Sequence, residues 1–115
     1  MELSSRTAYT ISATIFAISF GELILPASVG NSLPILSNPV TAVAMVAYYG
    51  VISFIFSLII DKYSTKTALA SFFIYGSIVE LILFLNVIDI VGFLFFGVLY
   101  IFLFGVPMWF TKKYF

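Results

Sequence analysis

The chain has 115 residues, of which 63% are hydrophobic and 9% are charged, with five basic and five acidic side chains. Soluble domains are about 45–50% apolar and about 25% charged, so this composition indicates an integral membrane protein. Zero net charge and no basic patch argue against a nucleic-acid partner. Cysteine and histidine are absent, which excludes disulfides and argues against zinc, copper and haem sites.

Four segments are long and apolar enough to cross a bilayer as helices, which takes about 20 residues each. We predict these spans at 7–29, 40–60, 67–88 and 90–110. A loop with two prolines, a short charged loop and a tight turn separate them. The sequence therefore predicts an all-α integral membrane protein in which residues 1–115 form one transmembrane domain, a compact four-helix bundle.

All five basic residues fall on one side of these spans. Arg6 precedes the first span, Lys62 and Lys66 lie between the second and third, and Lys112 and Lys113 follow the fourth. Cytoplasmic loops of membrane proteins are enriched in lysine and arginine, so we expect both termini in the cytoplasm. We expect a multi-pass protein of the cytoplasmic or plasma membrane of a prokaryote.

Two glutamates lie inside predicted spans, in the similar segments Ser19-Phe-Gly-Glu22-Leu-Ile-Leu and Ser77-Ile-Val-Glu80-Leu-Ile-Leu. An ionisable side chain at the centre of a membrane helix costs roughly 2.5–3.5 kcal/mol to insert, and such residues usually have a function. The first and third spans run in the same direction. The match therefore fits a parallel duplication of a two-helix hairpin, with chance similarity in an apolar chain as the alternative.

The serine three residues before each glutamate lies on the same helix face and can help to solvate the carboxyl. We expect Glu22 and Glu80 to face protein rather than lipid, at similar depth, where they are candidates for a proton site or a partner site. Four tyrosines are candidate hydrogen-bond donors to these carboxyls: Tyr48, Tyr49, Tyr75 and Tyr100.

Two prolines are candidates for helix kinks, and several small residues are candidates for helix packing faces. Pro26 cannot donate a hydrogen bond to the Glu22 carbonyl, and Pro107 cannot donate one to the Leu103 carbonyl, so both are predicted to kink their helices. Stripes of small residues on the second and fourth spans are predicted to be packing faces, within the bundle or against another chain. These residues are Gly50, Ser53, Ser57, Gly97 and Gly105.

These features favour two classes of function. The first is a small accessory or structural subunit of a larger membrane protein complex, which packs on partner helices in the lipid bilayer. Such a subunit is not an enzyme, and we expect no catalytic residue, metal or cofactor in it. The alternative is a small proton- or cation-coupled transporter that uses Glu22 and Glu80. Four spans are few for a pathway through one chain, so the transporter is expected to be a homo-oligomer.

Overall fold

The computed structural model describes residues 3–24, 30, 38–83 and 90–114. The regular structure in these residues is entirely helical, and four helical stretches are long and apolar enough to cross a membrane. The helices are α1 (Leu3–Ala17), which continues as the π-helix η1 (Ile18–Ile24), α3 (Pro39–Lys62), α4 (Thr65–Leu83) and α5 (Ile90–Tyr114). The predicted all-helical class is confirmed, and the lengths and compositions suggest a multi-pass membrane protein.

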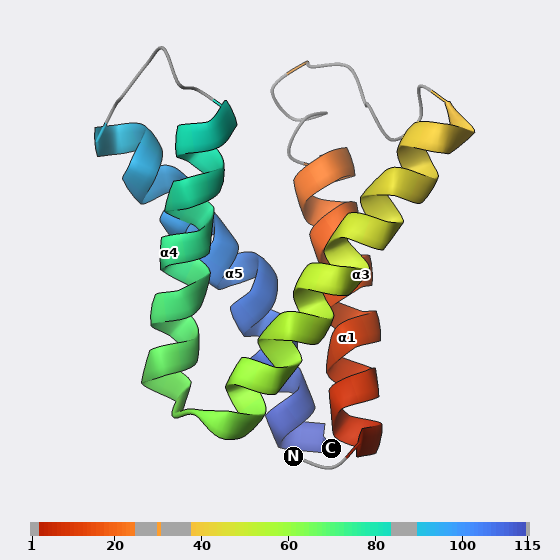
Figure 1. The fold of residues 1–115 in the computed structure, drawn as a ribbon, viewed down its shortest axis with the longest axis vertical. Helices are drawn as coiled ribbons and strands as arrows, with labels where there is room; N and C mark the ends of the chain where they lie inside the picture. Colours follow the sequence, from red (N-terminus) through yellow and green to blue (C-terminus); the bar gives the residue numbers. More distant parts are fainter. Residues whose placement is uncertain (1–2, 25–29, 31–37, 84–89, 115) are drawn as a thin grey trace.

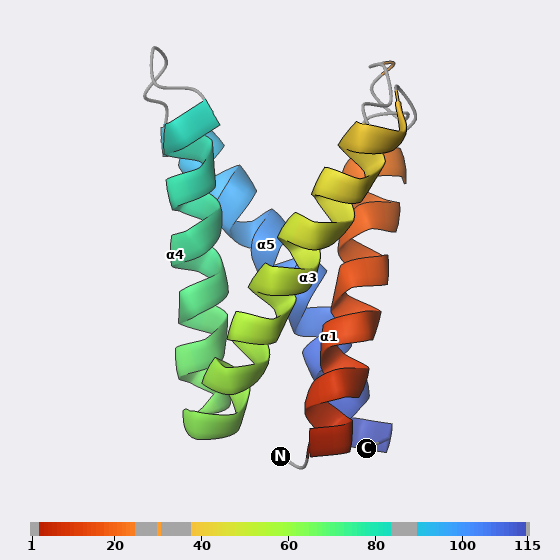
Figure 2. The same cartoon turned by 45° about the vertical axis from the view of Figure 1, so that its right-hand side comes forward.

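The helices form two pairs that meet at one end of the molecule and diverge toward the other (Figure 1). Helix α1 packs mainly on α3, and α4 packs mainly on α5. Helix α5 begins beside α4 and crosses behind α3 to end near the start of α1, so it joins the two pairs. The consecutive helices α3 and α4 have few contacts with each other. They are joined by a turn at one end and diverge with distance from it, as Figure 2 shows.

An aromatic core holds the two pairs together. Every α-helix contributes at least one large buried aromatic side chain to it, among them Tyr9, Phe56, Phe72 and Phe104. The Phe56 ring meets the Phe72 ring edge-on at 4.7 Å between centroids, and the Phe104 ring at 4.8 Å. Edge-to-face pairs add about 0.5–1.5 kcal/mol each beyond the area they bury. The Tyr9 hydroxyl also donates a 3.0 Å hydrogen bond to the Phe104 carbonyl.

Local signals fix the ends of the two central helices. Asn38 caps α3 by accepting a 2.7 Å hydrogen bond from the Thr41 N–H, and Pro39 occupies the first turn, where its missing N–H costs nothing. At the other end α3 runs through Lys62, whose charge complements the negative end of the helix dipole. Ser64 then accepts a 3.3 Å hydrogen bond from the Thr67 N–H at the start of α4.

The helices therefore extend beyond the predicted spans. Helix α1 begins at Leu3, the charged segment after position 60 is mostly helical, and α5 continues to Tyr114. Hydropathy predicts only the apolar centre of a helix. Capping residues and charged residues at the membrane interface allow the helix to continue beyond that centre. The predicted ends at 29 and 88 lie outside the described residues.

The basic residues gather at the end where both termini lie (Figure 1). Arg6 of α1 forms a 2.5 Å ion pair with Asp61 of α3. Lys112 donates a 2.7 Å hydrogen bond to the Thr65 hydroxyl, and Lys113 lies 4.9 Å from the centre of the Trp109 ring. We call this end the basic end.

Candidate functional site

The first span ends in a π-helix that carries Glu22. Buried side chains recur every four residues along α1, at Tyr9, Ala13 and Ala17. Hydrogen bonds in a π-helix connect residues five apart, so its turn is wider than that of an α-helix. Glu22 follows Ala17 by five residues and therefore lies on the same side of the helix as the buried residues of α1. Such π-helical turns are rare and often occur at functional sites.

Glu22 is half-buried and has a specific partner. The Tyr49 hydroxyl donates a 2.7 Å hydrogen bond to Glu22 Oε1, which ties η1 to α3. Tyr49 is one of the four tyrosines predicted as candidate donors to a glutamate carboxyl, and through this bond the half-buried Glu22 side chain contacts α3.

Glu22 lines a cavity of about 400 Å³ to which η1, α3, α4 and α5 all contribute. The other lining residues are Tyr48, Tyr49, Tyr75, Ile78, Val79, Ile82 and Tyr100. The hydroxyls of Tyr48 and Tyr75 are hydrogen-bonded to each other across the helix pairs. We call this space the tyrosine cavity.

The tyrosine cavity lies halfway along the helices. Tyr49, Tyr75 and Tyr100 are each near the middle of their helix. In a chain that spans a bilayer, this position is near the midplane of the membrane. Binding sites of transporters lie at this depth, often where two structural repeats meet.

Glu80 occupies a different place. Its side chain is only 4% exposed, and its Oε2 atom has no hydrogen-bond partner in the described part of the chain. The carboxyl lies against Gly92 of α5, where an added Cβ would be 2.6 Å from Oε1. The Ser77 hydroxyl donates a 3.3 Å hydrogen bond to the Phe93 carbonyl rather than to the glutamate.

The structure therefore does not combine the two glutamates in one site. Glu22 belongs to the tyrosine cavity, whereas Glu80 is not among the residues that line it and is buried between α4 and α5. Ser19 lies half-buried on η1. The divergence of the helix pairs explains the separation, because equal depth along two helices does not bring their faces together.

The predicted packing faces have unequal roles. Gly97 lies under the Phe73 ring, where an added Cβ would be 2.4 Å from the nearest ring carbon, and Gly105 has ordinary contacts with Leu69. Ser53 and Ser57 are buried inside the chain. At Gly50, by contrast, an added Cβ would meet no atom within 4 Å. The face around Gly50 is open.

The structure describes one of the two prolines predicted to kink their helices. Pro26 lies outside the described residues. Pro107 is buried inside α5 and leaves the Leu103 carbonyl without its usual helical donor. The next carbonyl, that of Phe104, accepts the hydrogen bond from Tyr9, so the α1–α5 contact forms beside the interruption.

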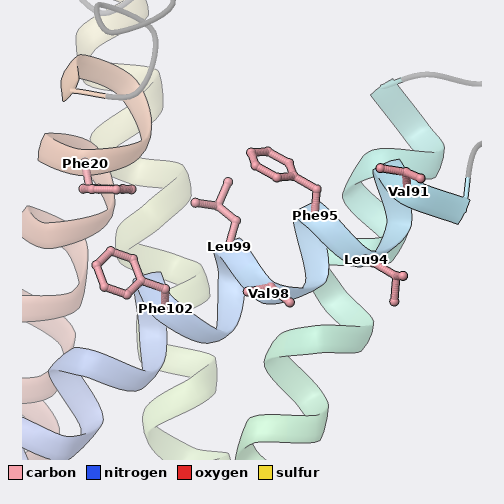
Figure 3. Close-up of a pocket in the computed structure, with 7 residues that line it drawn as sticks. All are labelled: Phe20, Val91, Leu94, Phe95, Val98, Leu99 and Phe102. Atoms are coloured by element: carbon pink, nitrogen blue, oxygen red, sulfur yellow. The ribbon is translucent and has the colours of Figure 1, made fainter.

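A second cavity, of about 680 Å³, lies along the outer face of α5 and is lined only by apolar side chains (Figure 3). Phe20 of η1 faces Phe102 across one end of it, with ring centroids 4.9 Å apart. The remaining lining residues are Val91, Leu94, Phe95, Val98 and Leu99. No polar group directs a ligand there, and no sequence signal predicted this groove, because it depends on where η1 meets α5.

The described residues contain no group of three or more acidic side chains able to hold a metal ion. No protein family matches the sequence, and comparisons with curated proteins and with solved structures find no match.

Proposed function

We propose that this chain is an integral membrane protein of a prokaryotic cell, with both termini in the cytoplasm, and that it serves as a small accessory subunit of a larger membrane protein complex. Within the most apolar window of each span, only 17–28% of the residues are buried inside the chain. Most of the helical surface is therefore left to lipid and to other helices.

The open face of α3 carries this proposal. Ala44 and Ala47 are exposed, and they lie near Gly50, where an added Cβ would meet nothing. Small residues allow membrane helices to approach closely, and this approach is what drives helix association in lipid. The corresponding small residue on α5, Gly97, is already covered by Phe73 of the same chain. The face around Gly50 is thus the one left for a partner helix.

Co-purification tests the proposal. The chain is captured from its native membrane in mild detergent, as wild type and as Ala47→Trp. We expect larger membrane subunits at stoichiometric yield with the wild type and their loss with the variant. Ile15→Trp is the matched control, because Ile15 is 61% exposed and lies on α1 rather than on α3, and the variant should keep the partners. Recovery of the chain alone, or unchanged association of Ala47→Trp, would contradict the subunit role.

The tyrosine cavity favours a second candidate, a small homo-oligomeric transporter coupled to protons or cations. Its supporting observation is a carboxyl, Glu22, in a cavity that all four spans line near mid-depth. Glu80 would be the second membrane carboxyl of this candidate, and the pairing of α1 with α3 and of α4 with α5 fits the proposed hairpin duplication. In reconstituted vesicles Glu22→Gln should abolish coupled flux while the protein stays assembled. Flux that persists in this variant would exclude the transporter.

A further inference from the structure

The tyrosine cavity holds a carboxyl group, and no basic side chain lines the cavity beside it. Its lining contains no lysine or arginine. Arg6, Lys112 and Lys113 have partners at the basic end, far along the helices from Glu22. Among the described residues, the Glu22 carboxyl accepts a hydrogen bond from the uncharged hydroxyl of Tyr49, which brings no positive charge to the site.

Four tyrosine rings line the same cavity as this carboxyl. The Tyr48 and Tyr49 rings meet edge-on with centroids 5.0 Å apart, and the Tyr75 and Tyr100 rings are tilted with centroids 5.5 Å apart. One hydrogen bond joins the hydroxyls of Tyr48 and Tyr75, and the Tyr49 hydroxyl donates to Glu22, so two of the four tyrosine O–H donors are engaged. Most of the cavity wall is ring and alkyl carbon. Ring faces attract cations, and they do so more strongly when the site is desolvated.

The volume and the lining residues of the cavity indicate which class of cation it can bind. Calcium takes six to eight oxygen ligands and magnesium needs six in close octahedral geometry, whereas this cavity offers one carboxyl. Its volume of about 400 Å³ is that of a small-molecule site rather than of a bare ion. Ile78, Val79 and Ile82 supply the apolar wall that alkyl or aryl substituents need.

We infer that the tyrosine cavity binds an organic monocation of the quaternary-ammonium class, with Glu22 opposite the charge and the tyrosine rings around it. Aromatic cages with a nearby negative charge are the usual site for such cations. The inference does not depend on the subunit role. It concerns the cavity of the transport candidate but requires only binding, so a failure to observe flux would leave it standing.

Equilibrium dialysis of the purified chain in lipid nanodiscs tests this inference, with empty nanodiscs as the blank. The probes are benzyltrimethylammonium and its uncharged carbon isostere, neopentylbenzene. We expect saturable binding of one benzyltrimethylammonium per chain and no saturable binding of the isostere. This comparison uses the unmodified protein, so it is independent of how well any variant folds. Equal binding of the two probes would overturn the inference.

Four variants locate the bound cation. Glu22→Gln should weaken binding at least tenfold, whereas Asp61→Asn, which removes a carboxylate at the basic end, should leave it within about twofold. Tyr75→Leu should weaken binding severalfold, and Tyr75→Phe, which keeps the ring, should retain most of it. Unchanged binding by Glu22→Gln, or an equal loss with Asp61→Asn, would show that the cation does not sit in this cavity.

Discussion

Glu80 lies directly against Gly92, and an added Cβ at residue 92 would be 2.6 Å from the glutamate Oε1 and 3.2 Å from its Cδ. The carboxyl of α4 thus fills the space that a side chain on α5 would occupy. The same interface includes the hydrogen bond from Ser77 to the Phe93 carbonyl. A buried membrane carboxyl is accommodated here because the residue opposite it has no side chain.

Gly92→Ala should lower the free energy of unfolding, because its new methyl group overlaps the Glu80 carboxyl. Overpacking of this kind costs about 1–3 kcal/mol. In a Glu80→Ala background the space is free, and the same glycine substitution should cost much less. A double-mutant cycle, measured by reversible unfolding in bicelles, should show a coupling of about 0.5–3 kcal/mol. Equal costs in the two backgrounds would contradict the contact.

Gly76 and Gly50 both lie near the middle of a helix, and Gly76→Ala should lower the free energy of unfolding more than Gly50→Ala does. A Cβ at Gly76 would be 2.4 Å from the Phe96 carbonyl oxygen and 2.9 Å from the Tyr100 Cβ, so the backbones of α4 and α5 must separate. We expect a loss of about 3 kcal/mol, at the upper end of overpacking effects. Gly50→Ala is the control. It meets no atom and should gain up to about 1 kcal/mol from helix propensity. The two alanine variants would be compared in the same bicelle unfolding assay, and similar effects at both positions would be inconsistent with this interface.

Tyr9→Phe should destabilise the junction of α1 and α5. The substitution keeps the buried ring but removes the hydrogen bond to the Phe104 carbonyl. Hydrogen bonds between membrane helices contribute about 0.6 kcal/mol on average and up to about 1.7, and this fully buried one should lie toward the upper value. Tyr63→Phe, at a 52% exposed position, should change stability little. Thermal unfolding of both variants in one detergent would reveal the difference, and equal midpoints would argue against the bond.

Cysteine labelling tests the proposed orientation, because the natural chain contains no cysteine. Tyr63→Cys places a thiol at the basic end, and Ile90→Cys places one at the opposite end, both at exposed positions. A membrane-impermeant maleimide should label Ile90→Cys on intact cells and label Tyr63→Cys only after lysis. The reverse pattern would place the termini outside the cell.

Much of the fold could be predicted from composition and pattern. A run of about 20 apolar residues has few alternatives to a membrane helix, since every backbone polar group must be satisfied within the segment. The tyrosine bonded to Glu22 was also among the four predicted donors. The exposed fractions and partners of the two glutamates could not be predicted. Their partners lie on α3 and α5, and these helices are apolar on all sides, so no amphipathic pattern indicates which side faces protein.

The sequence by itself determined the all-helical class, the four helices long and apolar enough to cross a membrane, and the gathering of the basic residues at one end. These follow from segment length, hydropathy and the number of helices between the charges. Only the tertiary structure decided that Glu22 lies with four tyrosines while Glu80 lies against Gly92. Two similar segments at similar depth acquire different surroundings when their helix pairs diverge. Which helix faces meet depends on how side chains distant in sequence fit together. The glycines matter most, because the absence of a side chain lets α4 and α5 approach closely.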